Sequence, residues 1–220
     1  MSLVGFFDIL GTRDKIMDNR FCDTDVLEFV NAIGVAAGFT PGVRFAVFSD
    51  SLIIATEPTQ LRPLLQGLNF MYANWSSELV YVRGAFSCGD ARWVDDPVTD
   101  KHFRRLPNLT YARIYGKGLV SAYQLEQSSG PGAICFLTDA AAALFREQET
   151  ASVLDGHAPM LCWATARQAS IADGYASSHM ERSRKDSLEW RQAVATKHYW
   201  TSVLANEKFL PDDYDKTSGH

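Results

Sequence analysis

The chain has 220 residues, of which 46% are hydrophobic and 21% charged, with a formal net charge of −5 at pH 7. This length suits one globular unit with a buried core, and the acidic balance argues against binding a nucleic acid polymer. No apolar run approaches the ~20 residues of a membrane-spanning helix and no signal-peptide pattern is present, so we expect a cytoplasmic protein without a membrane span.

The first half of the chain alternates between β-favouring runs and amphipathic helical patterns. Residues 3–9 predict a buried strand, because Val4, Phe6 and Phe7 favour β-structure and Gly11 follows the run. Apolar residues recur at helical spacing after Thr24 and predict a helix that stops near Gly38. Next come a hairpin of strands at 43–48 and 52–56, a helix along 61–75 with one apolar face, and a strand at 80–86.

The second half begins with a polar, irregular stretch at 89–108, which indicates a long loop or hairpin. Residues 165–208 are rich in helix formers and predict two C-terminal helices broken near Ser183. Between these segments we expect a short helix at 119–126, a strand at 133–138, a helix at 139–147 and a strand at 160–163.

This order of elements predicts an α+β fold, with an antiparallel sheet and helices packed on one of its faces. We expect a single domain over residues 1–208 that includes additional C-terminal helices. From Pro211 onward the chain is polar and acidic without periodicity, and residues 209–220 are expected to form a flexible tail.

Two lone carboxylates end otherwise apolar strands. Asp8 closes the first strand, and Asp50 occupies the tip of the following hairpin. If that strand lies beside the hairpin, both side chains reach one edge of the sheet, where they form a set of hard oxygen ligands for Mg²⁺ or Mn²⁺. The ordinary alternative is that Asp8 caps the Gly11–Thr12 segment and Asp50 only makes a turn. Spacing alone favours that alternative, because two carboxylates are a weak motif.

Four segments in order resemble class III nucleotidyl cyclases, over about residues 3 to 138. GFFDILGT resembles the first metal motif of that family, and FAVFSDS is similar to the hairpin with its second metal aspartate. VRGAFSCG is similar to the next strand, with its basic residue and closing glycine in register. The compact DILGT opening and the altered catalytic helix after residue 116 look most like those of the pyrimidine cyclases of bacterial Pycsar antiphage systems. The segments are 5–12, 45–51, 82–89, and 114–116 with Ala122, Leu125 and Glu126.

The resemblance implies a ferredoxin-like fold and a homodimer with composite active sites. It implies catalytic roles for Asp8 and Asp50, and two divalent cations, Mn²⁺ or Mg²⁺, bound by both aspartates and the carbonyl of Ile9. The backbone at Leu10, Gly11 and Thr12 would then hold the triphosphate. The partner subunit would supply the base pocket and groups that stabilise the transition state.

The resemblance also places four residues that depart from the purine cyclases. Ala46 and Arg113 stand where those enzymes read the base, and Val120 and Gln124 replace the usual Asn and Arg of the following helix. Arg carries donors only and suits the carbonyl oxygens of uracil. Alternatively, Ala46 and Val120 are core residues, Gln124 lies on a helix surface and Arg113 is a solvated cation.

The expected function is cyclisation of a pyrimidine nucleoside triphosphate, with UTP ahead of CTP, to cyclic UMP and pyrophosphate. The resemblance implies that the product is a second messenger of antiphage signalling, read by a separate effector. Two alternatives stay open: a cyclase-like nucleotide-binding module that has lost catalysis, suggested by Val120 and Gln124, and a purine cyclase with an unusual pocket.

Overall fold

A computed structural model describes residues 2–94, 114–147 and 152–211. Its centre is a seven-stranded sheet in the order β2-β3-β1-β4-β7-β9-β8, in which all pairs are antiparallel except β4 with β7. A separate ribbon pairs β5 with β6; β5 falls within the stretch at 89–108 where a loop or hairpin was expected, and β6 follows that stretch. The strands are β1 (Ser2–Ile9), β2 (Val43–Phe48), β3 (Ser51–Thr56), β4 (Val82–Gly89), β5 (Arg92–Trp93), β6 (Ile114–Tyr115), β7 (Cys135–Leu137), β8 (Ser152–Leu154) and β9 (Met160–Cys162).

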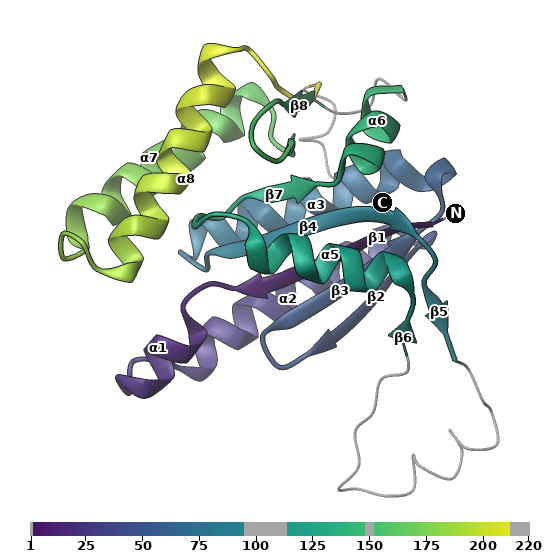
Figure 1. The fold of residues 1–220 in the computed structure, drawn as a ribbon. Coiled ribbons are helices and arrows are strands. Elements are labelled where there is room, and N and C mark those ends of the chain that lie inside the picture. The colour runs from purple at the N-terminus through teal and green to yellow at the C-terminus, as the bar shows by residue number, and fades with distance from the viewer. Residues whose placement is uncertain (1, 95–113, 148–151, 212–220) are drawn as a thin grey trace, which may run out of the picture.

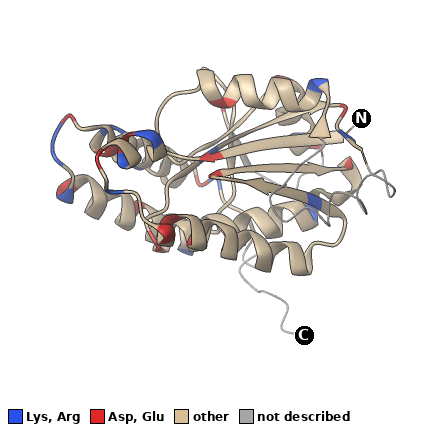
Figure 2. Ribbon diagram, turned by 90° about the horizontal axis from the view of Figure 1, so that it is seen from below, with Lys and Arg blue, Asp and Glu red and all other residues tan. Residues whose placement is uncertain are grey.

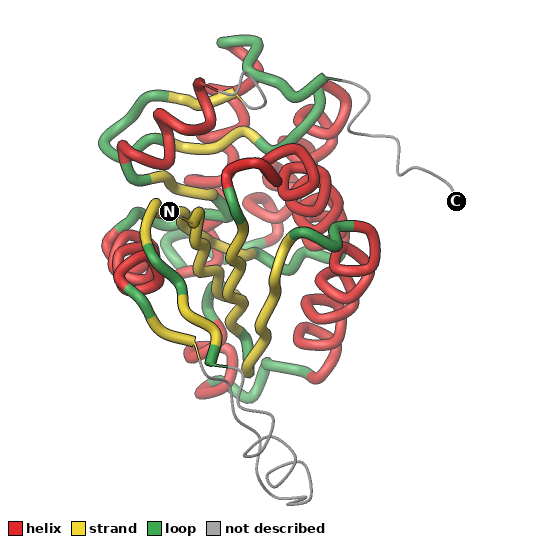
Figure 3. The backbone as a smooth tube through the Cα atoms, turned by 90° about the vertical axis from the view of Figure 1, so that its right-hand side faces the viewer, coloured by secondary structure: helices red, strands yellow, loops and turns green. Residues whose placement is uncertain are grey.

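Helices cover both faces of the sheet (Figure 1), as the view in Figure 3 also shows. The helices α2 and α3 pack together behind the sheet, α5 crosses its other face against β1 and β4, and α7 and α8 form an antiparallel pair. The helices are α1 (Thr12–Met17), α2 (Asp23–Phe39), the short 3₁₀ turn η1 (Pro58–Gln60), α3 (Leu61–Ser77), α5 (Lys117–Ser128), α6 (Asp139–Glu147), α7 (Ala166–Arg182) and α8 (Leu188–Ala205).

The expectation of helices on one face is wrong for α5, and β1 shows why. Successive side chains of a strand point to opposite faces, and β1 is apolar on both. Phe7 belongs to the main core with the residues of α2 and α3, whereas Phe6 belongs to a smaller cluster with Ile53 and Ala122 of α5. A strand with two apolar faces requires a helix on each of them.

The first six long elements have the order β1, α2, β2, β3, α3, β4, and their strands lie in the spatial order β2-β3-β1-β4. This is the split βαβ arrangement of ferredoxin-like folds. The expected α+β class and this topology are confirmed. The arrangement places β1 between β3 and β4, so the end of β1 has a neighbour on each side.

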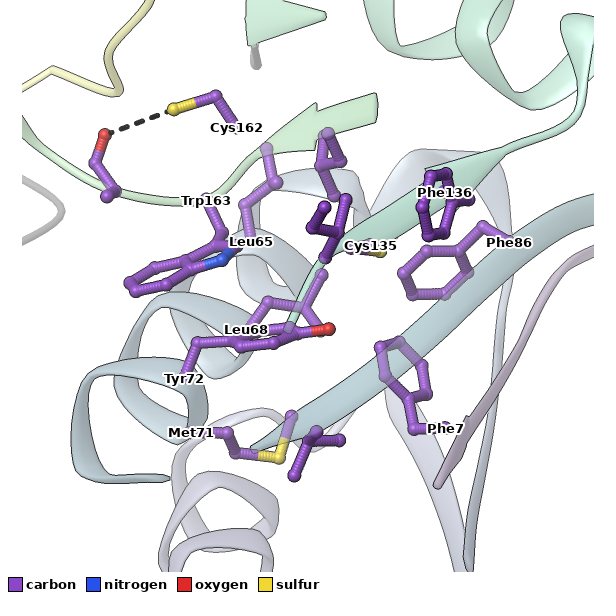
Figure 4. Close-up of a cluster of buried hydrophobic side chains, with 14 of the residues drawn as sticks. Phe7, Leu65, Leu68, Met71, Tyr72, Phe86, Cys135, Phe136, Cys162 and Trp163 are labelled. Atoms are coloured by element: carbon purple, nitrogen blue, oxygen red, sulfur yellow. Dashed lines mark hydrogen bonds between the residues drawn. The ribbon is translucent and has the colours of Figure 1, made fainter. Parts of the chain in front are cut away.

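Aromatic side chains fill the main core between the sheet and α3 (Figure 4). Tyr72 stacks on Trp163 with ring centroids 5.0 Å apart, and Phe7 meets Phe86 edge-on at 5.3 Å. The cross-strand partner of Phe7 is Gly84, and a Cβ atom there would lie only 2.1 Å from the Phe7 ring. Glycine is therefore required at this position by close packing.

The two predicted C-terminal helices are confirmed, and both have side-chain N-caps. Thr165 and Gln168 form a capping box at α7, and Ser187 accepts from the Trp190 amide at α8. The sequence prediction omitted α1 and β8, and its tail began too early. Leu210 is buried, and its amide donates to the Ala164 carbonyl at 2.8 Å, so the packed chain extends beyond residue 208.

Residues 212–220 lie outside the described part of the chain. Within the ranges given above, no helix combines the length and apolar character needed to cross a bilayer.

Candidate active site

Asp8 lies near the end of β1, on the face that α5 covers. Its Cα partners are Ser51 on β3 and Arg83 on β4. The Ser51 hydroxyl donates a hydrogen bond to Asp8 Oδ1 at 2.8 Å. Asp8 therefore accepts a hydrogen bond from a neighbouring strand. Within the described residues, its side chain makes no hydrogen bond to the Gly11–Thr12 segment that would cap it.

Asp50 follows Ser49 in the two-residue turn between β2 and β3. Ser49 adopts a positive φ of 55°, which a tight hairpin turn demands. The Asp50 carbonyl accepts from the Ile9 amide at 3.1 Å, which fixes the turn against the end of β1. Because β1 lies beside β3 of the hairpin, Asp8 and Asp50 come to one edge of the sheet, as expected for that arrangement.

The surroundings of Asp8 disfavour its charged form. Burial is the largest cause and raises the pKa of Asp8 from 3.8 to about 6. The hydrogen bond from Ser51 lowers this pKa, the negative charges of Asp50 and Glu126 raise it, and Arg83 lowers it. A bound cation would stabilise the charged forms of both aspartates, because they lie near each other in a partly desolvated position.

Arg83 and Glu126 form an ion pair beside Asp8 that the sequence prediction did not assign to the site. Arg83 Nη2 lies 2.6 Å from Glu126 Oε1, and Nε donates to the same oxygen at 2.7 Å. The Glu126 side chain is fully buried, and its second oxygen accepts from Gln127. The sequence offers two signals for this pair: Arg83 is a lone basic residue in an apolar strand, and Glu126 is a lone acid on the buried side of α5.

The segment after Asp8 forms a sharp turn into α1. Gly11 adopts φ 78°, in the left-handed region that favours glycine. The Thr12 hydroxyl donates to the Ile9 carbonyl at 3.1 Å, and the Leu10 amide donates to the Tyr81 carbonyl at 2.8 Å. Because the Leu10 amide is already used, the backbone groups best placed for a phosphate are those of Gly11 and Thr12.

The remaining predicted residues lie at different places around α5. Ala46 packs against the small cluster that includes Phe6 on the α5 face of the sheet. Gln124 is exposed. Val120 is 54% exposed, so its assignment as a core residue is wrong. Arg113 lies outside the described residues.

The donor set fits a hard divalent cation. Asp8 and Asp50 offer carboxylate oxygens, and the Ile9 carbonyl keeps a second lone pair besides the one used by Thr12. A cation there would offset the repulsion that raises the pKa of Asp8. The described ranges contain no cluster of three or more His, Cys, Asp or Glu side chains arranged to hold a metal, so further ligands would have to come from the substrate or water.

Comparison with known proteins gives structural likeness without sequence likeness. No family model matches the chain, and no curated protein sequence matches it. A bacterial light-regulated adenylyl cyclase aligns with TM-score 0.48 and 12% identity, over 73% of this chain and 87% of that chain. Adenylate cyclases from Trypanosoma brucei align with TM-score 0.48 and 14% identity, over 73% and 86% of the two chains.

The guanylate cyclase domain of RhGC from Catenaria anguillulae, in complex with GTP, is also similar. It aligns with TM-score 0.46 and 14% identity, over 73% of this chain and 92% of that chain.

Proposed function

We propose that the chain is a nucleotidyl cyclase. The ribose 3′-hydroxyl of a nucleoside triphosphate loses its proton to water and forms a bond to the α-phosphorus, while the bond from that phosphorus to the bridging oxygen breaks and pyrophosphate leaves. No covalent enzyme intermediate forms. The observation that carries this proposal is the placement of Asp8 and Asp50 at one sheet edge, beside the Gly11 turn.

Asp8, Asp50 and the Ile9 carbonyl would hold two divalent cations, Mn²⁺ or Mg²⁺, which when bound lower the pKa of the attacking hydroxyl and offset phosphate charge. The other side chains position this set. Ser51 fixes one Asp8 oxygen, and the pairing of Asp50 with Ile9 fixes the turn. The backbone at Gly11 and Thr12 would bind the triphosphate, which aligns the nucleotide for in-line attack.

The test is a product assay with each of the four nucleoside triphosphates and Mn²⁺, in which any cyclic nucleotide is identified by mass. Asp50→Ala should remain folded and lose cyclisation, because Asp50 lies in a turn and its backbone makes the structural contact. Asp155→Ala is the matched control, since that aspartate side chain is 89% exposed and pairs only with Arg146 on α6 in the described chain. Near wild-type turnover by Asp50→Ala would remove the basis of the assignment.

The finer proposal is that UTP is the preferred substrate and cyclic UMP the messenger that a separate effector reads. It rests on the resemblance and on Arg113, whose guanidinium has donors only and suits the O4 of uracil. A mismatched buried donor costs about 1–3 kcal/mol, or roughly one to two decades in selectivity.

Arg113→Ala should therefore lower kcat/KM for UTP far more than for CTP. Equal losses on both substrates would show that Arg113 does not read the base. A product made from ATP or GTP alone would assign the chain to the purine alternative.

A further inference from the structure

A cavity of about 740 Å³ lies between α1 and the turn that joins α7 to α8. Neither proposed metal aspartate lines it. Charged residues of both signs gather at this end of the molecule (Figure 2). Its volume falls within the range of small-molecule sites, about 300–1,000 Å³.

The α1 wall of the cavity carries most of the acidic groups. Arg20 is held between Asp18, at 2.8 Å, and Glu189 on α8, at 2.7 Å. These two carboxylates are therefore already paired with a cation. Asp14 also lines the cavity, and in the described chain it takes part in no ion pair.

The opposite wall, at the end of α7, carries hydrogen-bond donors. Arg182 and Arg184 are exposed and form no ion pair within the described ranges. His179 Nε2 is shielded from solvent and has no hydrogen-bond partner among the described residues. Burial lowers the pKa of His179, and Arg182 and Lys15 lower it further against a smaller opposite effect of Glu189. This wall therefore carries a local excess of positive charge.

We infer that this cavity binds a small phosphorylated molecule of about the size of a nucleoside monophosphate. The phosphate oxygens accept from the guanidinium groups of Arg182 and Arg184. Hydroxyl or amino donors at the other end of the ligand reach Asp14, and Leu188 contacts its apolar part. The inference stands apart from the proposed cyclase activity, because neither metal nor turnover enters it.

Occupancy of the cavity also affects the Gly11 turn. A Cβ atom on Gly11 would lie 3.6 Å from Gln192 Nε2 and 3.9 Å from Leu188 Cδ2, so the start of α8 packs against this turn. Leu188 lines the cavity as well. A ligand that joins the α7 end to α1 therefore restrains the segment that follows Asp8.

The test is calorimetric titration of the full chain in EDTA with inorganic phosphate, UMP and AMP as probes. We expect both nucleoside monophosphates to bind at least tenfold more tightly than inorganic phosphate. Loss of charge-assisted hydrogen bonds in the Arg182→Ala/Arg184→Ala variant should weaken binding by about tenfold or more. Lys185→Ala is the matched control, because it removes an exposed cation from the same turn without touching the cavity lining.

A second measurement locates the ligand. Hydrogen exchange of the peptide at 12–20 should slow when UMP binds, and Asp14→Asn should weaken UMP binding but leave phosphate binding unchanged. Absence of binding at millimolar probe, or equal affinity of the double variant and Lys185→Ala, would overturn the site. Binding of phosphate as tight as that of UMP would overturn the assigned ligand size.

Discussion

At the residue scale, the candidate site concentrates negative charge in a partly buried place. Asp8 lies near Asp50 and Glu126, and Arg83 is the cation among these four side chains. The Arg83 guanidinium is paired with Glu126 at 2.6 Å, so it only partly relieves Asp8. The charged form of Asp8, which would bind a cation, therefore lowers the stability of the folded state.

The pH dependence of the free energy of unfolding measures this loss of stability. The folded-state pKa of Asp8 is about 6, above its ordinary 3.8, so its contribution to stability is full below pH ~4 and is lost as pH rises through about 6. Asp8→Asn cannot ionise and still accepts from Ser51. In EDTA it should gain about 1 kcal/mol over the wild type at pH 8 and nothing at pH 4, after discounting for solvent screening.

Urea denaturation at the two pH values provides the measurement, with Asp155→Asn as the control for an exposed carboxylate. The same stability difference at both pH values would contradict a raised Asp8 pKa. Addition of Mn²⁺ should then stabilise the wild type and leave Asp8→Asn unchanged.

At the scale of elements, close packing of β1 on β4 yields a prediction for two glycines. Gly84→Ala places a methyl group against the Phe7 ring and should destabilise the protein by about 1–3 kcal/mol or more. Gly174→Ala on α7 meets nothing within 4 Å and should stabilise by about 0.5–1 kcal/mol. Thermal unfolding of both variants checks the pair, and a stable Gly84→Ala protein would show that β1 and β4 can move apart.

Elements with strong periodicity were predictable, and short ones were not. The helix at residues 61–75 was predicted from one apolar face that α3 buries in the core. In contrast, α1 has six residues and no buried side chain, and β8 has three residues, so neither has a pattern to detect. Pairing with β9 makes β8 a strand, and pairing is a tertiary property.

The candidate site was predictable to a similar extent. Asp8 and Asp50 stand out because each is a carboxylate at the end of an apolar run. The contribution of Arg83 depends on the register of β1 with β4, which places it opposite Asp8. That of Glu126 depends on how α5 is rotated over the sheet. Neither the register of the two strands nor the rotation of α5 can be deduced from the sequence pattern of a single element.

At the scale of the whole molecule, the flank of α5 beside the site is unusually apolar for a surface. Val120 is 54% and Tyr123 48% exposed, and Tyr123 packs edge-on against Phe6 at a centroid distance of 5.1 Å. Exposed apolar side chains next to a site are typical of a surface that a partner covers. We propose that a second copy of this chain covers the surface, as in the homodimer with composite sites that the resemblance implies.

Composite sites predict complementation, assayed with UTP, between two chains that are each impaired on that substrate. If the proposed roles hold, an Asp8→Ala chain retains Arg113 for the base, and an Arg113→Ala chain retains Asp8 and Asp50 for the metals. Mixing them should restore up to one working site in each heterodimer, measured as cyclic nucleotide formed after confirmed subunit exchange. A mixture as inactive as both parents would show that each site belongs to one subunit.

The central position of β1 also affects how the chain can fold during synthesis. β1 leaves the ribosome before the other strands, yet its neighbours β3 and β4 are translated much later. Until β4 emerges, the two apolar faces of β1 and its unpaired backbone are open to incorrect contacts, and such long-range pairing is slow. Translation speed and chaperone binding along the segment up to Gly89 should therefore govern how much of this protein reaches its native state in a cell.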